Sequence, residues 1–173
     1  MLEGKKIIVT GSASGMGEAT LKAYVKAGAN VVGMDISDQK GKDISSNVNN
    51  IGPGKCSFIH IDVSDKDSVK NAFDLALDEL KTLDVLAHPA AIQGPADASD
   101  VKVEDWDNMF AVNVRGTMLT NQTAFKYMKK NGSGSIINFG SISGLRPEPS
   151  ASAYSAAKGA VHSWTRTAAG TWG

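Results

Sequence analysis

Short apolar runs alternate with longer amphipathic segments along the chain, and this alternation is its clearest pattern. The first apolar run, Ile7–Val9, leads into the glycine-rich stretch TGSASGMG, after which helical spacing extends from Glu18 to about Lys26. An apolar run, a tight turn and an amphipathic helix predict a strand–turn–helix unit. The next strand is predicted over Ala29–Asp35, with Gly28 as the stop signal of the helix before it.

The same pattern continues to the end of the chain. Further strands are expected within the stretches CSFIHIDV, LDVLAHPA and NGSGSIINFGS, and further helices over 38–49, from Ser64, over 103–130 and from about Ala153. In the helix from Ser64, Asp67 nearly completes a capping box, and one face is apolar, formed by Val69, Phe73, Leu77 and Leu80. Strand–helix alternation favours a parallel sheet with helices on both faces, because right-handed crossovers lay each helix over the sheet. We therefore expect one α/β domain over 1–173, without internal repeats or a linker.

Composition argues against several classes of protein. The charges balance to a formal net charge of zero and no block of lysine and arginine appears, which argues against binding to a nucleic-acid backbone or a membrane surface. Cys56 is the only cysteine and the histidines are scattered along the chain, so we predict neither a disulfide framework nor a metal site. The N-terminal apolar run is too short for a signal peptide or a membrane span, so a cytoplasmic protein with a small-molecule partner is expected.

The first turn holds Gly11, Gly15 and Gly17, separated by short side chains and by Met16. Glycines there let the backbone turn sharply and let a diphosphate approach the N–H groups at the start of the next helix, where the helix dipole favours negative charge. We expect this turn, with Ser14 and Met16, to bind a dinucleotide. A tight strand-to-helix connection without a ligand is the alternative.

A carboxylate follows at the end of the second predicted strand. Asp35 lies about 20 residues beyond the last glycine of the turn, where it can accept hydrogen bonds from both hydroxyls of an adenosine ribose. Its charge would repel a 2′-phosphate, and no lysine or arginine lies in the turn or directly after Asp35, so NAD is predicted over NADP. Ile36 joins this predicted site, as do Asp62 and Val63 at the end of the third strand, near the adenine. Helix capping is the alternative for both aspartates.

The residues of the second half then complete a family pattern. TGSASGMG with Asp35, Asn113 in NVRG, Ser141 in INFGSISG, and Tyr154 with Lys158 in YSAAK together resemble the short-chain dehydrogenase/reductase family, in its compact branch. The resemblance implies a Rossmann-like, doubly wound parallel sheet in three α/β/α layers. It also implies homodimers or homotetramers that assemble through two long helices.

The same resemblance implies an NAD-dependent oxidoreductase that transfers a hydride between NAD and a secondary alcohol or ketone. Ser141 would orient the substrate oxygen, Lys158 would hold the nicotinamide ribose, and Asn113 would support a water relay to Lys158. Tyr154 would exchange the proton. Two alternatives stay open: a catalytically inactive dinucleotide-binding or scaffold protein of the same fold, and a reductase that uses NADP.

The tyrosine–lysine pair has a physical basis apart from the family. Tyr154 and Lys158 are four residues apart, so both side chains share one face of a helix. A cation about 4 Å from a phenolate stabilises it by roughly 4 kcal/mol at an effective dielectric near 20, which favours proton exchange with an alcohol at neutral pH. The alternative is a solvated face with an aliphatic stem on a ring. Ser141 alone could form a turn, and Asn113 alone could be a polar residue of a long helix.

Two departures from the family pattern affect these expectations. After the fourth predicted strand the chain reads HPAA, where relatives usually carry two asparagines, alanine and glycine; Pro89 lacks an N–H, and Ala90 and Ala91 are left to contact the cofactor. We expect His88 to be satisfied by local hydrogen bonds. Family members also continue beyond the last helix, so the domain is expected to be incomplete at its C-terminus and to expose the edge of the fifth strand. The loops 92–100 and 144–151 are expected to border the substrate pocket.

Overall fold

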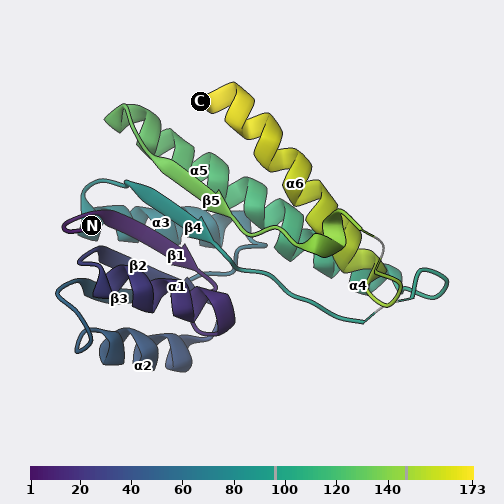
Figure 1. Cartoon of the computed structure of the whole chain (residues 1–173), viewed down its shortest axis with the longest axis horizontal. Coiled ribbons are helices and arrows are strands. Elements are labelled where there is room, and N and C mark those ends of the chain that lie inside the picture. The colour runs from purple at the N-terminus through teal and green to yellow at the C-terminus, as the bar shows by residue number, and fades with distance from the viewer. Residues whose placement is uncertain (96, 147) are drawn as a thin grey trace.

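The protein folds around one parallel sheet, seen in a computed structural model that describes residues 1–95, 97–146 and 148–173. The strands are β1 (Lys6–Thr10), β2 (Asn30–Asp35), β3 (Lys55–His60), β4 (Val85–His88) and β5 (Ser135–Asn138). Within the described residues they lie side by side in the order β3-β2-β1-β4-β5, and every neighbouring pair is parallel (Figure 1). The predicted parallel sheet is confirmed.

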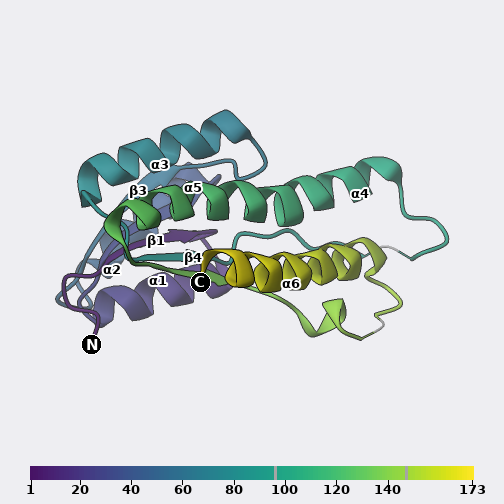
Figure 2. The same cartoon turned by 90° about the horizontal axis from the view of Figure 1, so that it is seen from above.

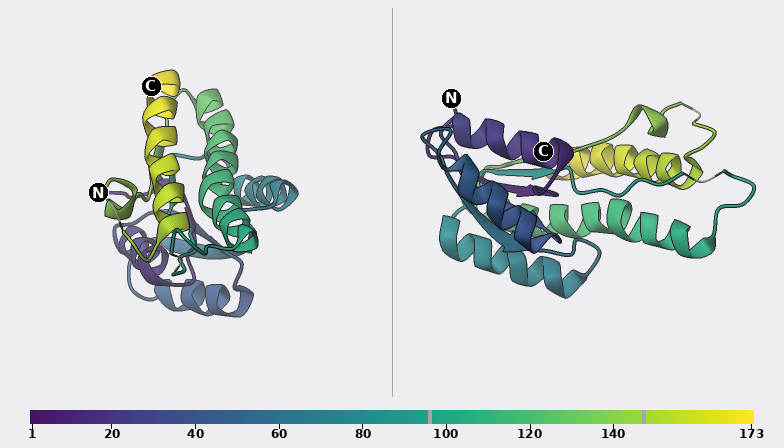
Figure 3. Two further views of the ribbon diagram at one scale, coloured as in Figure 1. Left: turned by 90° about the vertical axis from the view of Figure 1, so that its right-hand side faces the viewer. Right: turned by 90° about the horizontal axis from the view of Figure 1, so that it is seen from below.

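Helices cover both faces of this sheet. They are α1 (Gly15–Lys26), α2 (Asp38–Val48), α3 (Lys66–Leu80), α4 (Val103–Phe110), α5 (Gly116–Asn131) and α6 (Ser152–Trp172). Figure 2 shows α3 and the long α4–α5 rod on one side of the sheet and α1 on the other, where α2 also packs. The two views of Figure 3 agree, and they show α6 running alongside the rod. The layers are therefore helix, sheet and helix, as predicted.

Two apolar clusters, one on each face, hold the layers together. Alternate strand residues such as Ile8 and Leu86 pack with α3 and α5 around the fully buried Phe73. Their neighbours along the strands, such as Ile7 and Val9, pack with α1 and α2 on the opposite face. Because side chains of a strand point alternately to the two faces, an apolar run buried on both faces is typical of a parallel sheet between helices.

The strand order fixes where a ligand can enter. The chain leaves β1 toward β2 and β3 on one side, and later places β4 and β5 on the other side. At such a reversal the connections after adjacent strands diverge, and a crevice opens beyond the carboxyl ends of the strands. Here that position lies beyond Thr10 and His88, the last residues of β1 and β4.

Several element boundaries differ from the sequence-based expectation. The first helix begins at Gly15, inside the glycine-rich turn, rather than at Glu18. The helix expected from Ser64 begins at Lys66, and its N-cap is Asp65, whose carboxylate accepts the N–H of Ser68. The predicted Ser64 cap is therefore wrong. Gly28 has a φ of +94°, a backbone conformation that suits the predicted helix stop.

The long helix predicted over 103–130 exists but is not regular. Its middle, Ala111–Arg115, forms one turn of π-helix (η1) between α4 and α5. A π-turn inserts an extra residue into the helix and frequently marks a functional site. Ahead of α6, the chain also makes a short 3-10 turn, Ile142–Gly144 (η2).

Among the described residues β5 pairs only with β4, and Ile137 on β5 is an exposed apolar side chain.

In the described part of the chain, no helix combines the length and the apolar character needed to cross a membrane.

Candidate functional site

A cavity of about 380 Å³ lies beyond the carboxyl ends of the strands, at the reversal of strand order. This volume falls in the range of about 300–1,000 Å³ that is usual for cofactor sites. Every residue predicted to bind the cofactor, except Lys158, lines it: Gly11, Ser14, Gly15, Met16, Gly17, Asp35, Ile36, Asp62, Val63, Ala90, Ala91 and Tyr154. Residues from five separate stretches of the chain therefore meet in one place.

The glycine turn is shaped by close backbone approach. Gly11 has a φ of +58°, and a Cβ on it would lie 2.8 Å from the Cα of Ala90. A Cβ on Gly17 would collide with the carbonyl oxygen of Gly11. Gly15 has a φ of +51°, and a Cβ there would meet no atom within 4 Å. The first and last glycines are therefore needed for the turn itself, whereas Gly15 leaves open space beside the main chain at the start of α1.

Asp35 ties the glycine turn to the end of β2. One oxygen of its carboxylate accepts the N–H of Ala13 at 2.9 Å, and the other accepts the N–H of Ser37 at 2.9 Å. A carboxylate has about four lone-pair positions, so two bonds leave capacity for further donors. Ser37, not Asp35, is the N-cap of α2. The alternative in which Asp35 is the cap of that helix is therefore wrong.

Asp62 is engaged in a local turn as well as lining the cavity. Its carboxylate accepts the N–H and the hydroxyl of Ser64, at 2.8 and 2.7 Å, and its own N–H donates to the hydroxyl of Ser68. The alternative for Asp62 was a helix cap, and it is wrong, because the N-cap of the following helix α3 is Asp65. Val63 follows it and packs against Gly116, where a Cβ would lie 3.0 Å from a Val63 methyl group.

Tyr154 and Lys158 share one face of α6, as their spacing predicted. The Lys158 Nζ lies 5.7 Å from the centroid of the Tyr154 ring and donates to the carbonyl of Phe139 at 2.7 Å. Only 4% of Lys158 is exposed, and this burial lowers the pKa of its ammonium. An ammonium has three N–H donors, so the one bond to Phe139 leaves donors for other groups.

Ser141 follows β5, beside α6. Its hydroxyl oxygen accepts the N–H of Ser143 at 3.2 Å and lies 3.3 Å from the Ser143 hydroxyl, so Ser141 caps the 3-10 turn η2. The turn-forming role that was the alternative for Ser141 is therefore present. Its main chain contacts His162 of α6, through the carbonyl oxygen at 2.9 Å and the N–H at 3.4 Å.

Asn113 is buried within the π-turn, and its side chain bonds the main chain of the loop that follows β4. Its amide oxygen accepts the N–H of Ile92, and its amide N–H₂ donates to the carbonyl of Ile92, both at 2.8 Å. The same amide lies 3.0 Å from the sulfur of Met109. These bonds fix the loop that follows β4. The predicted water relay from Asn113 to Lys158 stays a prediction.

His88 is buried at the end of β4. Its Nδ1 lies 2.8 Å from the Thr10 hydroxyl and 3.2 Å from the Thr120 hydroxyl, whereas its Nε2 has no hydrogen-bond partner among the described residues. The expectation of local hydrogen bonds is confirmed for one ring nitrogen and wrong for the other. Burial, with the nearby charge of Lys158 as a smaller cause, lowers the pKa of His88 to about 3, so the ring is neutral at pH 7.

Some lining residues were not among those predicted to bind the cofactor. Ile61, Pro89, Ile92, Gln93 and Val112 also border the cavity. Ile92 and Gln93 belong to the loop 92–100 that was expected near the pocket; Ala96 of that loop, and Pro147 of the loop 144–151, lie outside the described residues. Ile92 and Gln93 follow a strand at the reversal point, and this position could also have assigned them to the cofactor site.

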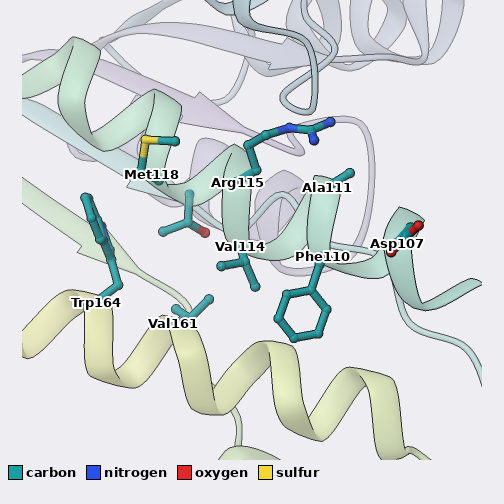
Figure 4. A pocket seen from close by; sticks show the side chains of 9 residues that line it. Asp107, Phe110, Ala111, Val114, Arg115, Met118, Val161 and Trp164 are labelled. Carbon is teal, nitrogen blue, oxygen red and sulfur yellow. The ribbon is translucent and has the colours of Figure 1, made fainter. Parts of the chain in front are cut away.

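Two other cavities have different chemistry. One, of about 510 Å³, lies between the α4–α5 rod and α6, where Phe110 and Val114 face Val161 and Trp164 (Figure 4). The other, of about 690 Å³, lies along β5 between α5 and the end of α6. Neither contains the glycine turn or the tyrosine–lysine pair, so the 380 Å³ cavity is the candidate site although it is smaller. Among the described residues, no group of three or more histidine, cysteine, aspartate or glutamate side chains is placed to hold a metal ion.

Comparisons with known proteins agree with this geometry. The family model described as short chain dehydrogenase matches residues 5–173. The chain is 34% identical over 166 residues to the 3-oxoacyl-(acyl-carrier-protein) reductase FabG of Thermotoga maritima, covering 96% of this chain and 67% of that protein. It is 35% identical over 165 residues to a cyclopentanol dehydrogenase of Comamonas sp., covering 95% and 66%.

A solved structure is similar over nearly the whole chain. The crystal structure of a short chain dehydrogenase from Mycobacterium smegmatis matches with a TM-score of 0.95 at 28% identity, covering 99% of this chain and 72% of that one. The chain spans about two thirds of the length of the curated relatives it matches.

Proposed function

The chain belongs to the short chain dehydrogenase family, and we propose that its protein is an NAD-dependent oxidoreductase that interconverts a secondary alcohol and a ketone. One observation carries the proposal: Tyr154, with Lys158 on the same helix face, borders the cavity that the glycine turn and Asp35 also line. Interconversion of an alcohol and a ketone by hydride transfer requires a group that exchanges a proton with the substrate oxygen, next to a site that binds a dinucleotide.

The residues present fit a dinucleotide. Gly15 leaves open space beside the main chain at the start of α1, and Ser14, the N-cap, makes no side-chain bond to the helix. The N–H groups of that first turn suit a diphosphate, because a helix N-terminus favours negative charge. Asp35 keeps acceptor capacity for the hydroxyls of a ribose. When bound, the nicotinamide supplies the hydride acceptor or donor.

This chain's own residues would manage the proton. In the oxidation, Tyr154 would accept the hydroxyl proton of the alcohol. The hydrogen on the carbinol carbon leaves as a hydride, with the electron pair of its C–H bond, and a C=O double bond forms. In the reduction, Tyr154 returns a proton to the carbonyl oxygen. Lys158 would hold the nicotinamide ribose with its remaining N–H donors. The Ser141 hydroxyl orients the substrate oxygen.

A preference for NAD is part of the proposal. The described lining of the cavity contains Asp35 and Asp62 but no lysine or arginine. A 2′-phosphate on the adenosine ribose would therefore meet a carboxylate without a cation to neutralise either charge. A hydroxyl at the same position would instead donate a hydrogen bond to Asp35. These charges support NAD over NADP.

We also propose that the protein is a homodimer or homotetramer through the face formed by α4, α5 and α6. The apolar cavity of about 510 Å³ opens there, with Asp107 and Arg115 at its border (Figure 4). Trp106 stacks on Phe110 with ring centroids 4.7 Å apart and is 36% exposed. Aromatic anchors with a charged border are typical of interfaces. Sedimentation velocity of the protein and of a Val114→Glu variant tests this oligomeric state.

The cytoplasmic location stays a prediction from the sequence.

The experiment for the activity uses the full-length protein with NAD and a panel of cyclic and aliphatic secondary alcohols. Cyclopentanol belongs in the panel because a relative is named for it. We expect NAD reduction with at least one alcohol, and its loss in Tyr154→Phe. The matched control is Tyr24→Phe, because Tyr24 is a residue of α1 that packs against the apolar cluster and does not line the cavity. Undiminished turnover in Tyr154→Phe would refute the role of the tyrosine, and NAD binding without any turnover would favour the inactive dinucleotide-binding protein.

A further inference from the structure

The side chain of a histidine in α6 packs against the segment that carries Ser141. His162 lies one helical turn beyond Lys158 and two beyond Tyr154, on the same side of the helix. Its Nε2 lies 2.9 Å from the carbonyl oxygen of Ser141 and 3.4 Å from the Ser141 nitrogen. The two main-chain polar groups of Ser141 therefore both face this one ring nitrogen.

Two glycines make room for the ring. A Cβ on Gly140 would lie 2.5 Å from the Cε1 of His162, and a Cβ on Gly144 would lie 2.9 Å from its Cδ2. Gly144 also lies against the main chain of Lys158, where a Cβ would come within 2.7 Å of the carbonyl carbon. Any larger residue at either position would displace the imidazole or the helix. The segment GSISG therefore folds around the His162 side chain.

The chemistry of the partners assigns the proton on the ring. A carbonyl oxygen only accepts hydrogen bonds, so the 2.9 Å contact requires a hydrogen on Nε2. With that hydrogen in place, Nε2 cannot also accept the N–H of Ser141, which explains why the second contact is the longer one, at 3.4 Å. His162 thus donates its Nε2–H to the Ser141 carbonyl.

Helix α6 holds this segment at two points. Lys158 donates to the carbonyl of Phe139, and His162 donates to the carbonyl of Ser141. By contrast, the described bonds of the Ser141 hydroxyl reach only Ser143, within the same segment. The distance between the serine and the tyrosine of α6 therefore depends on the helix contacts and not on the serine hydroxyl.

We propose that His162 is a positioning residue that holds Ser141 at a fixed place relative to Tyr154. The inference rests on the proposed function, in which Ser141 orients the substrate oxygen that Tyr154 protonates or deprotonates. Displacement of a catalytic group by about 1 Å can lower a rate by about 10²-fold, because the reacting atoms leave their attack geometry. The anchoring of Ser141 by His162 thus bears on turnover rather than on cofactor binding.

Three variants of the full-length protein test the proposal. In His162→Gln, the amide N–H₂ can reach the position of Nε2, so the bond to Ser141 can be made. In His162→Asn the amide is too short to reach it, and in His162→Leu no donor remains. We expect kcat to fall about 10- to 100-fold in the asparagine and leucine variants and by less than about 3-fold in the glutamine variant. NAD affinity, measured by titration, should not change in any of them.

A second readout does not depend on activity. Amide hydrogen exchange in the segment 139–145 should speed up in His162→Leu and His162→Asn but not in His162→Gln, while exchange in β1 stays as in the wild type. An inactive wild type that shows this exchange pattern would overturn the proposed function and leave the anchoring of Ser141 supported. An active wild type with equal kcat and equal exchange in all three variants would overturn the inference about His162.

Discussion

Replacing Asp35 by asparagine should change which cofactor the protein prefers. The carboxylate of Asp35 stands at the border of the cavity and accepts two main-chain N–H groups, from Ala13 and Ser37. Asparagine keeps the size and one acceptor oxygen but removes the negative charge. The electrostatic penalty against a 2′-phosphate therefore disappears, while the side chain keeps its size and one of the two main-chain bonds.

The size of the effect follows from the charges. A carboxylate and a unit charge about 4 Å apart interact by roughly 1 kcal/mol in bulk water and roughly 4 kcal/mol near a protein surface. A phosphate monoester carries about −1.5 to −2 charges at pH 7. Because Asp35 is only half-buried, the lower value applies, and the penalty is about 2 kcal/mol. The ratio of kcat/KM with NADP to kcat/KM with NAD should therefore rise about 30-fold.

The assay compares the two cofactors with one alcohol in the wild type and in Asp35→Asn. The matched control is Asp38→Asn, because Asp38 is a nearby carboxylate with a side chain that is 56% exposed and paired with His60. We expect the control to change the ratio by less than about 3-fold, since exposed charges are screened. An unchanged ratio in Asp35→Asn, or a wild type that prefers NADP, would refute the assignment of Asp35.

Three further predictions concern the turn, a buried titration and a helix cap. Gly17→Ala places a Cβ against the Gly11 carbonyl, so NADH affinity in a fluorescence titration should fall at least about 10-fold, and unchanged affinity would contradict the turn geometry. His88 has a lowered pKa of about 3, so the unfolded state binds the extra proton and stability falls as pH drops below about 6.5. Urea unfolding should show about 2 kcal/mol lost between pH 7 and pH 5, and His88→Asn should remove that loss; equal losses in both proteins would be inconsistent with a buried neutral ring. Asp65→Ala removes the bond to the Ser68 N–H and should lower the free energy of unfolding by about 1 kcal/mol in urea.

The sequence predicted most of the fold because the signals were local. Apolar runs and amphipathic helices are read within windows of a few residues, and their alternation was enough for the parallel sheet. The helix boundary near Ser64 failed because Ser64, Asp65 and Asp67 are all plausible cap residues. Only the direction of the carboxylate, with Asp65 accepting the Ser68 N–H, decides among them.

Features that depend on distant contacts were not predictable in the same way. The π-turn in the long helix contains Asn113, whose amide bonds both main-chain groups of Ile92, a residue of another loop. Whether the Nε2 of His88 finds a partner among the described residues depends on how α5 and the end of β1 pack around the ring. The contact of His162 with Ser141 depends on how the segment around Ser141 packs against α6. Helical periodicity carries no information on these contacts.

The most direct test of the account is transfer of a labelled hydrogen. The full-length protein is incubated with NAD and a secondary alcohol that carries deuterium on its carbinol carbon, and the reduced nicotinamide is analysed for deuterium. We predict deuterium transfer in the wild type and at least a 10²-fold slower transfer in Tyr154→Phe, with NAD affinity unchanged, because general acid–base catalysis contributes about 10²–10⁴-fold. Transfer at the wild-type rate in Tyr154→Phe would contradict the claim that the phenol beside Lys158 exchanges the proton.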